Sequence, residues 1–217
     1  MQRITTLASC LLAALSVSAV LVAPATAALP EFVGPIPNPF KSTSKKTKLE
    51  TNGKTKVTCA ASTDTGELTG PQSGVVTISF SGCEALKFPC ATPGVAGEIR
   101  TGTLTMTLGY VSRVPKEVGI DLSSPTGAPI TTFICGNLTG TVEGSVIGVI
   151  TPINKLTLPP RHFTLKFKQK KGKQQVIQLL GGSVDVLKTS LAGGPFEESG
   201  LASIDSLDFA APLEVKA

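Results

Sequence analysis

From about residue 55 onward, apolar and polar side chains alternate one by one along several segments of the chain. Val76, Ile78 and Phe80 fall on one face of such a segment, and the polar residues between them fall on the other. A period of two residues is typical of a β-strand with one buried face. The pattern recurs at 104–110, 118–122 and 163–167, and no stretch of comparable length shows the 3.6-residue period of a helix.

Turn-forming residues separate these segments at intervals of about 8 to 15 residues. Examples are Ser73-Gly74, Ser81-Gly82, Gly181-Gly182 and Gly193-Gly194-Pro195. Together they predict one antiparallel all-β domain over 55–217, with about 9–12 short strands closed as a β-sandwich or a β-barrel. The pattern does not choose between the two. The stretch FTLKFKQKKGKQQVIQLL predicts a hairpin with strands near 162–168 and 174–180 and a basic tip.

Residues 28–54 differ in composition from the rest of the chain: several prolines are followed by a stretch rich in lysine, serine and threonine. Pro30, Pro35, Pro37 and Pro39 fall within ten residues of one another. Such a composition is typical of linkers. We therefore predict a flexible arm with little order before about Lys54.

The first 27 residues have the three parts of a secretory signal peptide. Arg3 precedes an apolar stretch from Leu7 to Val22, and Ala25-Thr26-Ala27 offers small residues for cleavage near Ala27. A membrane anchor is the alternative, but Pro24 and the small residues end the apolar stretch early. We predict a protein that is secreted, extracellular or associated with the cell wall, and no transmembrane segment after the leader.

Leu7-Ala8-Ser9-Cys10 superficially matches a lipoprotein processing box. An acylated cysteine must follow the apolar segment, whereas most of that segment comes after Cys10. Cys10 is therefore interpreted as part of the leader.

The composition removes several kinds of chemistry. The 217 residues include one histidine, one tyrosine and no tryptophan. Sites built on two or three histidines are therefore excluded, and aromatic platforms for sugars have almost nothing to be built from. Phosphate-cradling loops, dinucleotide fingerprints and aspartate-rich calcium loops are also missing from the sequence. We expect no metal, no cofactor and no catalytic activity.

Four cysteines follow the leader, an even number for a compartment in which thiols are oxidised. They are Cys59, Cys83, Cys90 and Cys135. Two disulfides are predicted, and four cysteines allow three pairings among which the sequence does not choose. Cys83 and Cys90 flank a short segment that could close locally, which would leave Cys59 with Cys135. A four-thiolate zinc site would need closer cysteine pairs than these.

Positive charge is concentrated in two segments of a chain whose net charge is +5. Residues 41–56 contain six lysines and one glutamate, and residues 161–173 contain six Lys or Arg and no acid. Such clusters attract anionic cell-wall polymers or membrane surfaces, although lysine on exposed strands also serves solubility alone. Nucleic acid is not expected, because aromatic interleaving and a recognition helix are missing. The candidate anion-binding residues are Lys166, Lys168, Lys170, Lys171 and Lys173.

Two catalytic arrangements are alternatives to a non-catalytic protein. A hydrolase of the Ser-His-Asp type would have to use His162 with Asp121, Asp185, Asp205 or Asp208, and no G-x-S-x-G motif is present. His162 would share the outward strand face of Lys166 and Lys168, which indicates a solvated surface residue. Paired carboxylates of a glycosidase are the second arrangement, but no spacing forces two acids together. Those scattered acids are Glu67, Glu84, Glu98, Glu143 and Asp64.

The run ELTGPQSGVVTISFSGCEALKFPC, followed by GEIRTGTLTMTLGYV and GSVIGVITPINK, resembles an uncharacterised group of secreted proteins of soil actinobacteria. The resemblance covers most of the chain from about Cys59 and includes the cysteines. It implies an exported protein of a Gram-positive type of bacterium. It implies no activity and no site residues.

The leading hypothesis is a secreted, non-catalytic β-protein that associates with the cell envelope through basic surface patches. One alternative is a carrier that holds a small hydrophobic ligand inside a barrel, which requires an apolar cavity of roughly several hundred cubic ångströms. The other is a secreted hydrolase that uses His162.

Overall fold

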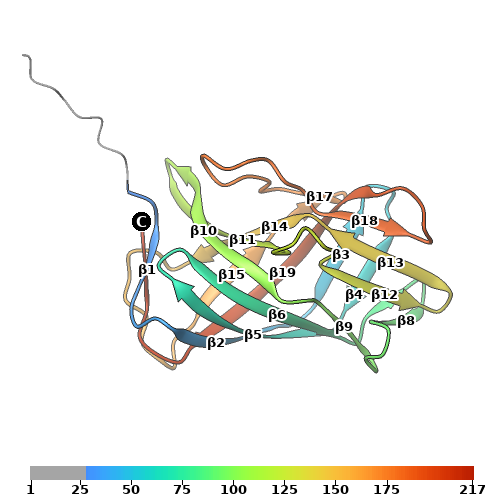
Figure 1. Cartoon of the computed structure of the whole chain (residues 1–217), viewed down its shortest axis with the longest axis horizontal. Helices are drawn as coiled ribbons and strands as arrows, with labels where there is room; N and C mark the ends of the chain where they lie inside the picture. Colours follow the sequence, from blue (N-terminus) through green and yellow to red (C-terminus); the bar gives the residue numbers. More distant parts are fainter. Residues whose placement is uncertain (1–27) are drawn as a thin grey trace, which may run out of the picture.

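The computed structural model describes residues 28–217, so the predicted leader at 1–27 lies outside the described residues. The described chain forms β-strands joined by turns and loops, and its elements include no helix. Figure 1 shows an elongated molecule in which long strands cross obliquely at one end and shorter strands gather at the other.

Eight antiparallel strands form a closed barrel. Their order is β15-β14-β11-β10-β6-β5-β2-β19, and pairing of β15 with β19 closes the circle. The predicted all-β class is thereby confirmed, and the architecture is a barrel. The barrel strands are β2 (Asn38–Ser44), β5 (Ala61–Gly70), β6 (Ser73–Ser81), β10 (Leu104–Arg113), β11 (Lys116–Ser123), β14 (Ser145–Thr151), β15 (Phe163–Phe167) and β19 (Glu197–Phe209).

A second ring of shorter strands shares β19 with the barrel. Residues from Ser203 onward in β19 pair with β15 and β2, whereas the residues before them pair with β3 and β18. The ring runs β19-β18-β13-β12-β8-β7-β4-β3 and returns to β19. It lies at the end of the molecule opposite the C-terminus (Figure 1). Its other strands are β3 (Thr47–Thr51), β4 (Lys56–Cys59), β7 (Glu84–Ala85), β8 (Phe88–Ala91), β12 (Thr131–Cys135), β13 (Leu138–Glu143) and β18 (Lys188–Leu191).

Five short strands complete the described fold. β1 (Glu31–Val33) pairs with β20 (Glu214–Lys216), β9 (Glu98–Arg100) pairs with β6, and β16 (Gln169–Lys170) pairs with β17 (Lys173–Gln174). The described chain therefore has twenty strands, more than the predicted 9–12. The difference arises because several strands are only two to five residues long and carry too few alternations to be recognised.

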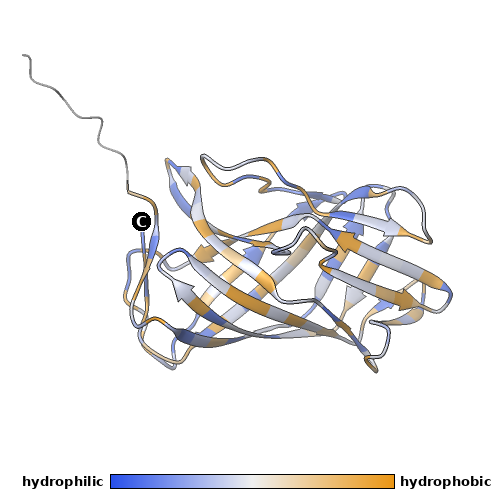
Figure 2. Cartoon of the chain, viewed as in Figure 1, coloured by the Kyte–Doolittle hydropathy of each residue, from blue (hydrophilic) through white to orange (hydrophobic). Residues whose placement is uncertain are grey.

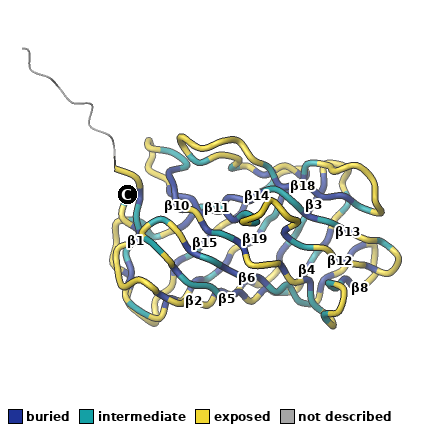
Figure 3. Tube along the Cα trace, viewed as in Figure 1, coloured by how far each residue is buried: buried dark blue, intermediate teal, exposed yellow. Residues whose placement is uncertain are grey.

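The barrel core is built from the alternating apolar residues of the sequence. Ile120, Ile150 and Phe163 are almost completely buried, and Phe163 packs edge-on against Phe209 with 5.6 Å between ring centroids. Figure 2 shows apolar and polar positions alternating along the strands, and Figure 3 shows the buried ones in the middle of the molecule with exposed residues in the loops. Removal of these side chains from water is the main stabilising term for such a fold.

The flexible arm predicted for 28–54 is wrong. β1, β2 and β3 all lie in this segment, and β2 shows strict alternation of buried and exposed residues. The inward residues of β2 are Asn38, Phe40, Ser42 and Ser44. Because three of these four are polar, the strand has no hydrophobic period for the sequence to reveal.

The predicted hairpin at 162–180 is correct at its tip and wrong in its strands. Lys171 and Gly172 have φ values of 54° and 77°, as a two-residue hairpin turn requires. However, β15 pairs with β14 and β19, and residues 175–187 form no strand. This segment lies instead on the outside of the barrel, where the Leu180 amide donates to the Tyr110 carbonyl at 2.7 Å.

The four cysteines form the two predicted disulfides, but not with the local pairing. The bonds join Cys59 to Cys83 and Cys90 to Cys135. Cys90 and Cys135 face each other in the ladder between β8 and β12. Local closure of Cys83 with Cys90 does not occur, although the Cys90 amide donates to the Cys83 carbonyl at 2.8 Å; each thiol instead bonds a cysteine of another strand, Cys59 of β4 or Cys135 of β12.

Candidate functional site

A groove on the outside of the barrel brings the two basic segments of the sequence together. It has a volume of about 930 Å³ and crosses β2, β19 and β15. Lys45 and Lys46 line one side, and Lys166 and Lys168 line the other. These two pairs are more than 100 residues apart in the chain, and the barrel closure makes them neighbours.

Strand register explains how the four lysines reach the groove. On β15, Lys166 points outward between the buried Leu165 and Phe167, and Lys168 follows the end of the strand. Lys45 and Lys46 connect β2 to β3. The predicted outward face of Lys166 and Lys168 is confirmed by their exposure.

The groove contains neutral groups and no acid among its described lining residues. Its floor is the outer face of β19, where Ile204 is 58% exposed and lies opposite Lys166. Hydroxyl and amide groups also line it: Thr43, Ser44, Ser203, Ser206, Gln169 and Gln175. Four ammonium groups that no lining carboxylate neutralises create a positive potential suited to an anion.

The other three candidate lysines lie outside the groove. Lys170, Lys171 and Lys173 belong to the β16–β17 hairpin, and Lys173 forms a salt bridge of 2.9 Å with Glu198. The sequence therefore pointed to Lys166 and Lys168 but assigned Lys45 and Lys46 to a flexible arm. The dense lysine content of 41–56 marks this segment as an anion-attracting cluster, but no local pattern places Lys45 and Lys46 beside Lys166 and Lys168.

Two carboxyl groups lie inside the barrel, beneath the groove. Asp64 on β5 and Asp205 on β19 are each 6% exposed, and β2 separates the two strands. Ser42 and Ser44 of β2 point inward between them, and the Ser44 hydroxyl lies 2.8 Å from that of Ser62. The small side chains of β2 leave room for both carboxyls to reach the interior.

The polar groups of this cluster are incompletely paired. The Ser203 hydroxyl donates to Asp205 Oδ1, but Asp64 Oδ1 and Ser42 Oγ have no hydrogen-bond partner among the described residues. Both atoms belong to residues that line a small interior cavity of about 20 Å³, together with Asp205. Such a volume accommodates about one water molecule.

Burial makes both interior carboxyls weak acids. Loss of hydration and, to a smaller extent, the neighbouring Asp205 together raise the pKa of Asp64 to about 7. Burial also raises the pKa of Asp205, to about 6, although the Ser203 hydrogen bond opposes this shift. The sequence named both residues as separate candidates and gave no sign that they lie near each other.

His162 lies on the barrel surface, outside the groove. Its Nδ1 is 3.5 Å from Asp208 Oδ1, and both side chains are 56% exposed. The shallow depression around His162 is lined by Pro152, Lys155, Leu156, Thr157, Pro160 and Arg161, so no serine of the described chain lines it. The described structure thus supplies an acid for this histidine but not the serine that a Ser-His-Asp arrangement needs beside it.

The remaining candidate acids do not form a pair. Glu98 binds Arg100 at 3.1 Å, while Glu67, Glu84 and Glu143 lie on three different strands. Asp121 is on the outer face of β11, where burial under the 175–187 segment raises its pKa and the nearby Asp185 adds to the effect.

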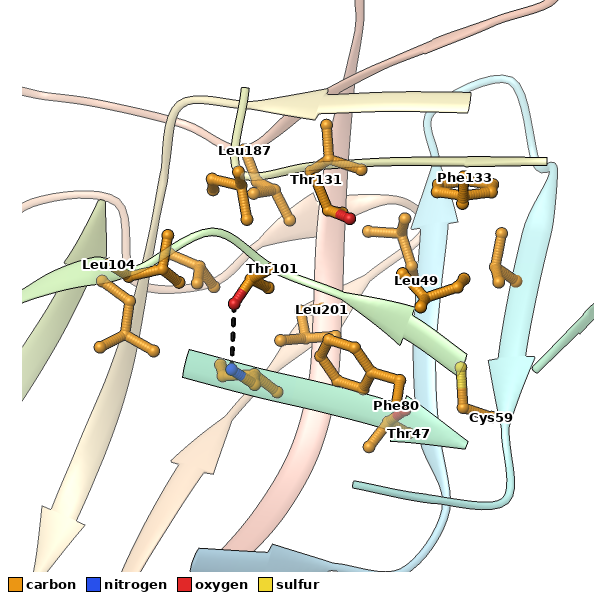
Figure 4. A pocket seen from close by; sticks show the side chains of 17 residues that line it. Thr47, Leu49, Cys59, Phe80, Thr101, Leu104, Thr131, Phe133, Leu187 and Leu201 are labelled. Atoms are coloured by element: carbon orange, nitrogen blue, oxygen red, sulfur yellow. Dashed lines mark hydrogen bonds between the residues drawn. The ribbon is translucent and has the colours of Figure 1, made fainter. Parts of the chain in front are cut away.

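An apolar cavity lies where the barrel meets the second ring. Figure 4 shows Leu49, Phe80, Leu104, Phe133, Leu187 and Leu201 around it, with the Thr101 hydroxyl occupied by the Ile78 amide at 3.0 Å. Its volume is about 70 Å³. The carrier hypothesis requires several times this space, because even a 150 Å³ cavity holds no more than a benzene-sized molecule.

The chain matches no family model, and searches of curated proteins and of solved structures find no match either. In residues 28–217 no helix has the length and apolarity needed to cross a membrane.

Proposed function

We propose that this protein binds an extended phosphodiester polymer of the bacterial cell exterior in the groove formed by Lys45, Lys46, Lys166 and Lys168. The observation that carries the proposal is the convergence of these four lysines on one groove that no acid lines. Each ammonium group can act as a point charge for one phosphate, and the strand geometry fixes their order.

The shape of the site favours a polymer over a membrane surface. The lysines stand on both sides of a recessed floor, so a narrow chain can contact all four at once. Lys166 and Lys168 are two residues apart, which corresponds to about 6.8 Å along a strand. Exposed Ile204 between the basic rows offers an apolar contact to the carbon backbone that joins successive phosphates.

Export supports the choice of partner. The leader predicted at 1–27 and the resemblance to secreted actinobacterial proteins both stay predictions, since the first lies outside the described residues and the comparisons find no match. The two disulfides are compatible with an oxidising compartment outside the cytoplasm. Phosphate-bearing wall polymers are abundant polyanions in that location.

The test measures binding of lipid-free poly(glycerol phosphate) to the secreted protein at low and high salt. Replacing all four groove lysines with glutamate should weaken binding at least tenfold at low salt. A matched control carries the same charge change at exposed lysines elsewhere, namely Lys87, Lys155, Lys188 and Lys216. The control should change binding much less.

Equal losses in the two variants would show that net charge alone attracts the polymer, and would refute the groove. Retention by anionic lipid vesicles but not by the soluble polymer would identify a membrane surface instead. Circular dichroism of both variants establishes that each retains its β-structure.

A further inference from the structure

The groove and the buried carboxyl pair lie on opposite sides of a gap in the strand pairing of the barrel wall, which we call the seam. The ladder between β19 and β2 begins at Asp205, and the ladder between β19 and β3 ends at Ala202. Ser203 and Ile204 therefore have no ladder partner on the side of Lys45 and Lys46. The strand is held there only from the other side, by β15.

Two serines connect the two sides of this seam. Ser44 and Ser203 both line the groove. Inside the barrel, Ser203 donates to Asp205 and Ser44 contacts Ser62. The two carboxyls are therefore separated from the groove by a single layer of strands, the barrel wall.

Among residues 28–217, no positive group lines the cavity beside the carboxyl pair. Every other residue that lines its cavity is uncharged, from β2 through β6, β10, β11, β15 and β19: Phe40, Ser42, Val76, Ile78, Met106, Leu122, Leu165 and Leu207. On the outer faces of β2, β5, β15 and the part of β19 from Ser203 onward, and within two residues of their ends, the charged or titratable groups are Lys41, Lys45, Lys46, Glu67, Arg161, His162, Lys166, Lys168 and Asp208. Protons are thus the simplest means of neutralising the pair.

We propose that Asp64 and Asp205 form a proton-dependent regulator of the groove, so that anionic polymer binds more tightly when the pair is protonated than when it is ionised. This inference rests on the proposed function of the groove. Protonation leaves the positive potential of the four lysines uncompensated and keeps the seam dry. Ionisation places negative charge beneath the lysines, draws water toward Ser42 Oγ and Asp64 Oδ1, and loosens the segment of β19 that forms the floor.

The expected size follows from Coulomb interaction through the barrel wall. Charges separated by roughly 10–15 Å in a medium of intermediate dielectric change an anion's affinity by about three- to tenfold. A phosphodiester probe keeps its charge throughout the experiment. Every protein compared carries His162→Gln, so that no imidazole contributes to the comparison.

The experiment measures the Kd of poly(glycerol phosphate) at about pH 5.5 and about pH 8, at constant salt. In the His162→Gln protein, Kd should rise three- to tenfold with pH. Adding Asp64→Asn or Asp205→Asn should flatten this dependence and keep the tight binding at pH 8. Adding Asp208→Asn, which removes an exposed acid from the same outer face, should leave the dependence in place.

Each outcome decides the matter. Binding that is independent of pH, or a pH dependence that survives in both interior variants, overturns the regulator and leaves the groove intact. Failure of the protein to bind the polymer at any pH overturns the proposed function and the regulator together. If thermal stability at pH 8 depends on Ca²⁺ or Na⁺ and this dependence disappears in Asp64→Asn, the pair holds a cation, and the proton-dependent regulator is wrong.

Discussion

The barrel and the second ring are both closed sheets, but they differ in the length of the ladders that join neighbouring strands. In the barrel, most neighbouring strands share ladders of four or more residue pairs; β5 and β6, for example, stay paired from Ala61–Ser81 to Gly70–Ser73. In the ring, β4 meets β7 at one residue pair and β8 meets β12 at two. Apart from the gap at Ser203 and Ile204, backbone hydrogen bonds therefore hold the barrel wall over longer stretches than the weakest junctions of the ring.

Both disulfides lie at the weak junctions of the ring. Cys59 ends β4 and Cys83 immediately precedes β7, so their bond spans the junction that has a single residue pair. The Cys90–Cys135 bond lies within the short β8–β12 ladder. Covalent bonds thus take the place of ladder hydrogen bonds where the strands are too short to hold register.

Removing a disulfide should therefore break the ring and leave the barrel folded. The Cys90–Cys135 bond encloses a sequence separation of 45 residues, for which loop entropy gives about 4 kcal/mol. We expect a Cys90→Ser, Cys135→Ser protein to lose hydrogen-exchange protection in β8, β12 and β13 while β10, β11 and β14 keep theirs. Equal loss of protection in both regions would show that ring and barrel unfold as one unit.

The interior of the barrel and the ring should respond to pH with opposite signs. Asp64 has a folded pKa of about 7, above its usual 3.8, so it binds a proton more tightly in the folded protein. Its stabilising contribution is complete below about pH 4 and is lost as pH rises to about 7. Asp64→Asn should remove this loss and raise the free energy of unfolding at pH 8 by about 1–3 kcal/mol.

Urea unfolding at several pH values measures this effect. The matched control is Glu50→Gln in β3 of the ring, whose pKa is lowered because its carboxylate accepts hydrogen bonds from Lys48 and Gln169. A lowered pKa gives the opposite sign, with stability lost as the solution becomes more acidic. A wild-type protein whose stability does not fall between pH 4 and pH 7 would show that folding does not raise the pKa of Asp64.

The same contrast explains what the sequence could predict. The barrel strands β6, β10 and β11 carry apolar inward residues at every second position, so class and pairing direction follow from the chain itself. Strands β7 and β8 of the ring are too short to show a period. The sequence does not reveal β2 as a strand for another reason. Its inward residues Ser42 and Ser44 are small and polar, because they leave room for the buried carboxyls instead of filling the core.

The candidate site was only half visible because it depends on long-range closure. Lys166 and Lys168 stood out by their alternation with Leu165 and Phe167. Lys45 and Lys46 join them only because β19 pairs with both β2 and β15. The meeting of Asp64 with Asp205 has the same origin, and no local pattern indicates it.

The smallest effect is expected for the lysines that lie over the ring. The β16–β17 hairpin rests against β3, where a side chain added at Gly172 would meet the Thr51 backbone. Lys173 is already neutralised by Glu198, so the hairpin offers less free charge than the groove.

Replacing Lys170, Lys171 and Lys173 with glutamine should change the affinity for poly(glycerol phosphate) by less than about twofold, because exposed charges outside the contact are screened by salt. Replacing Lys166 and Lys168 with glutamine removes one charge fewer and should weaken binding more, which isothermal titration calorimetry can measure directly. If the hairpin variant loses more affinity than the groove variant, the polymer follows the ring and the site must be moved from β15 to the β16–β17 hairpin.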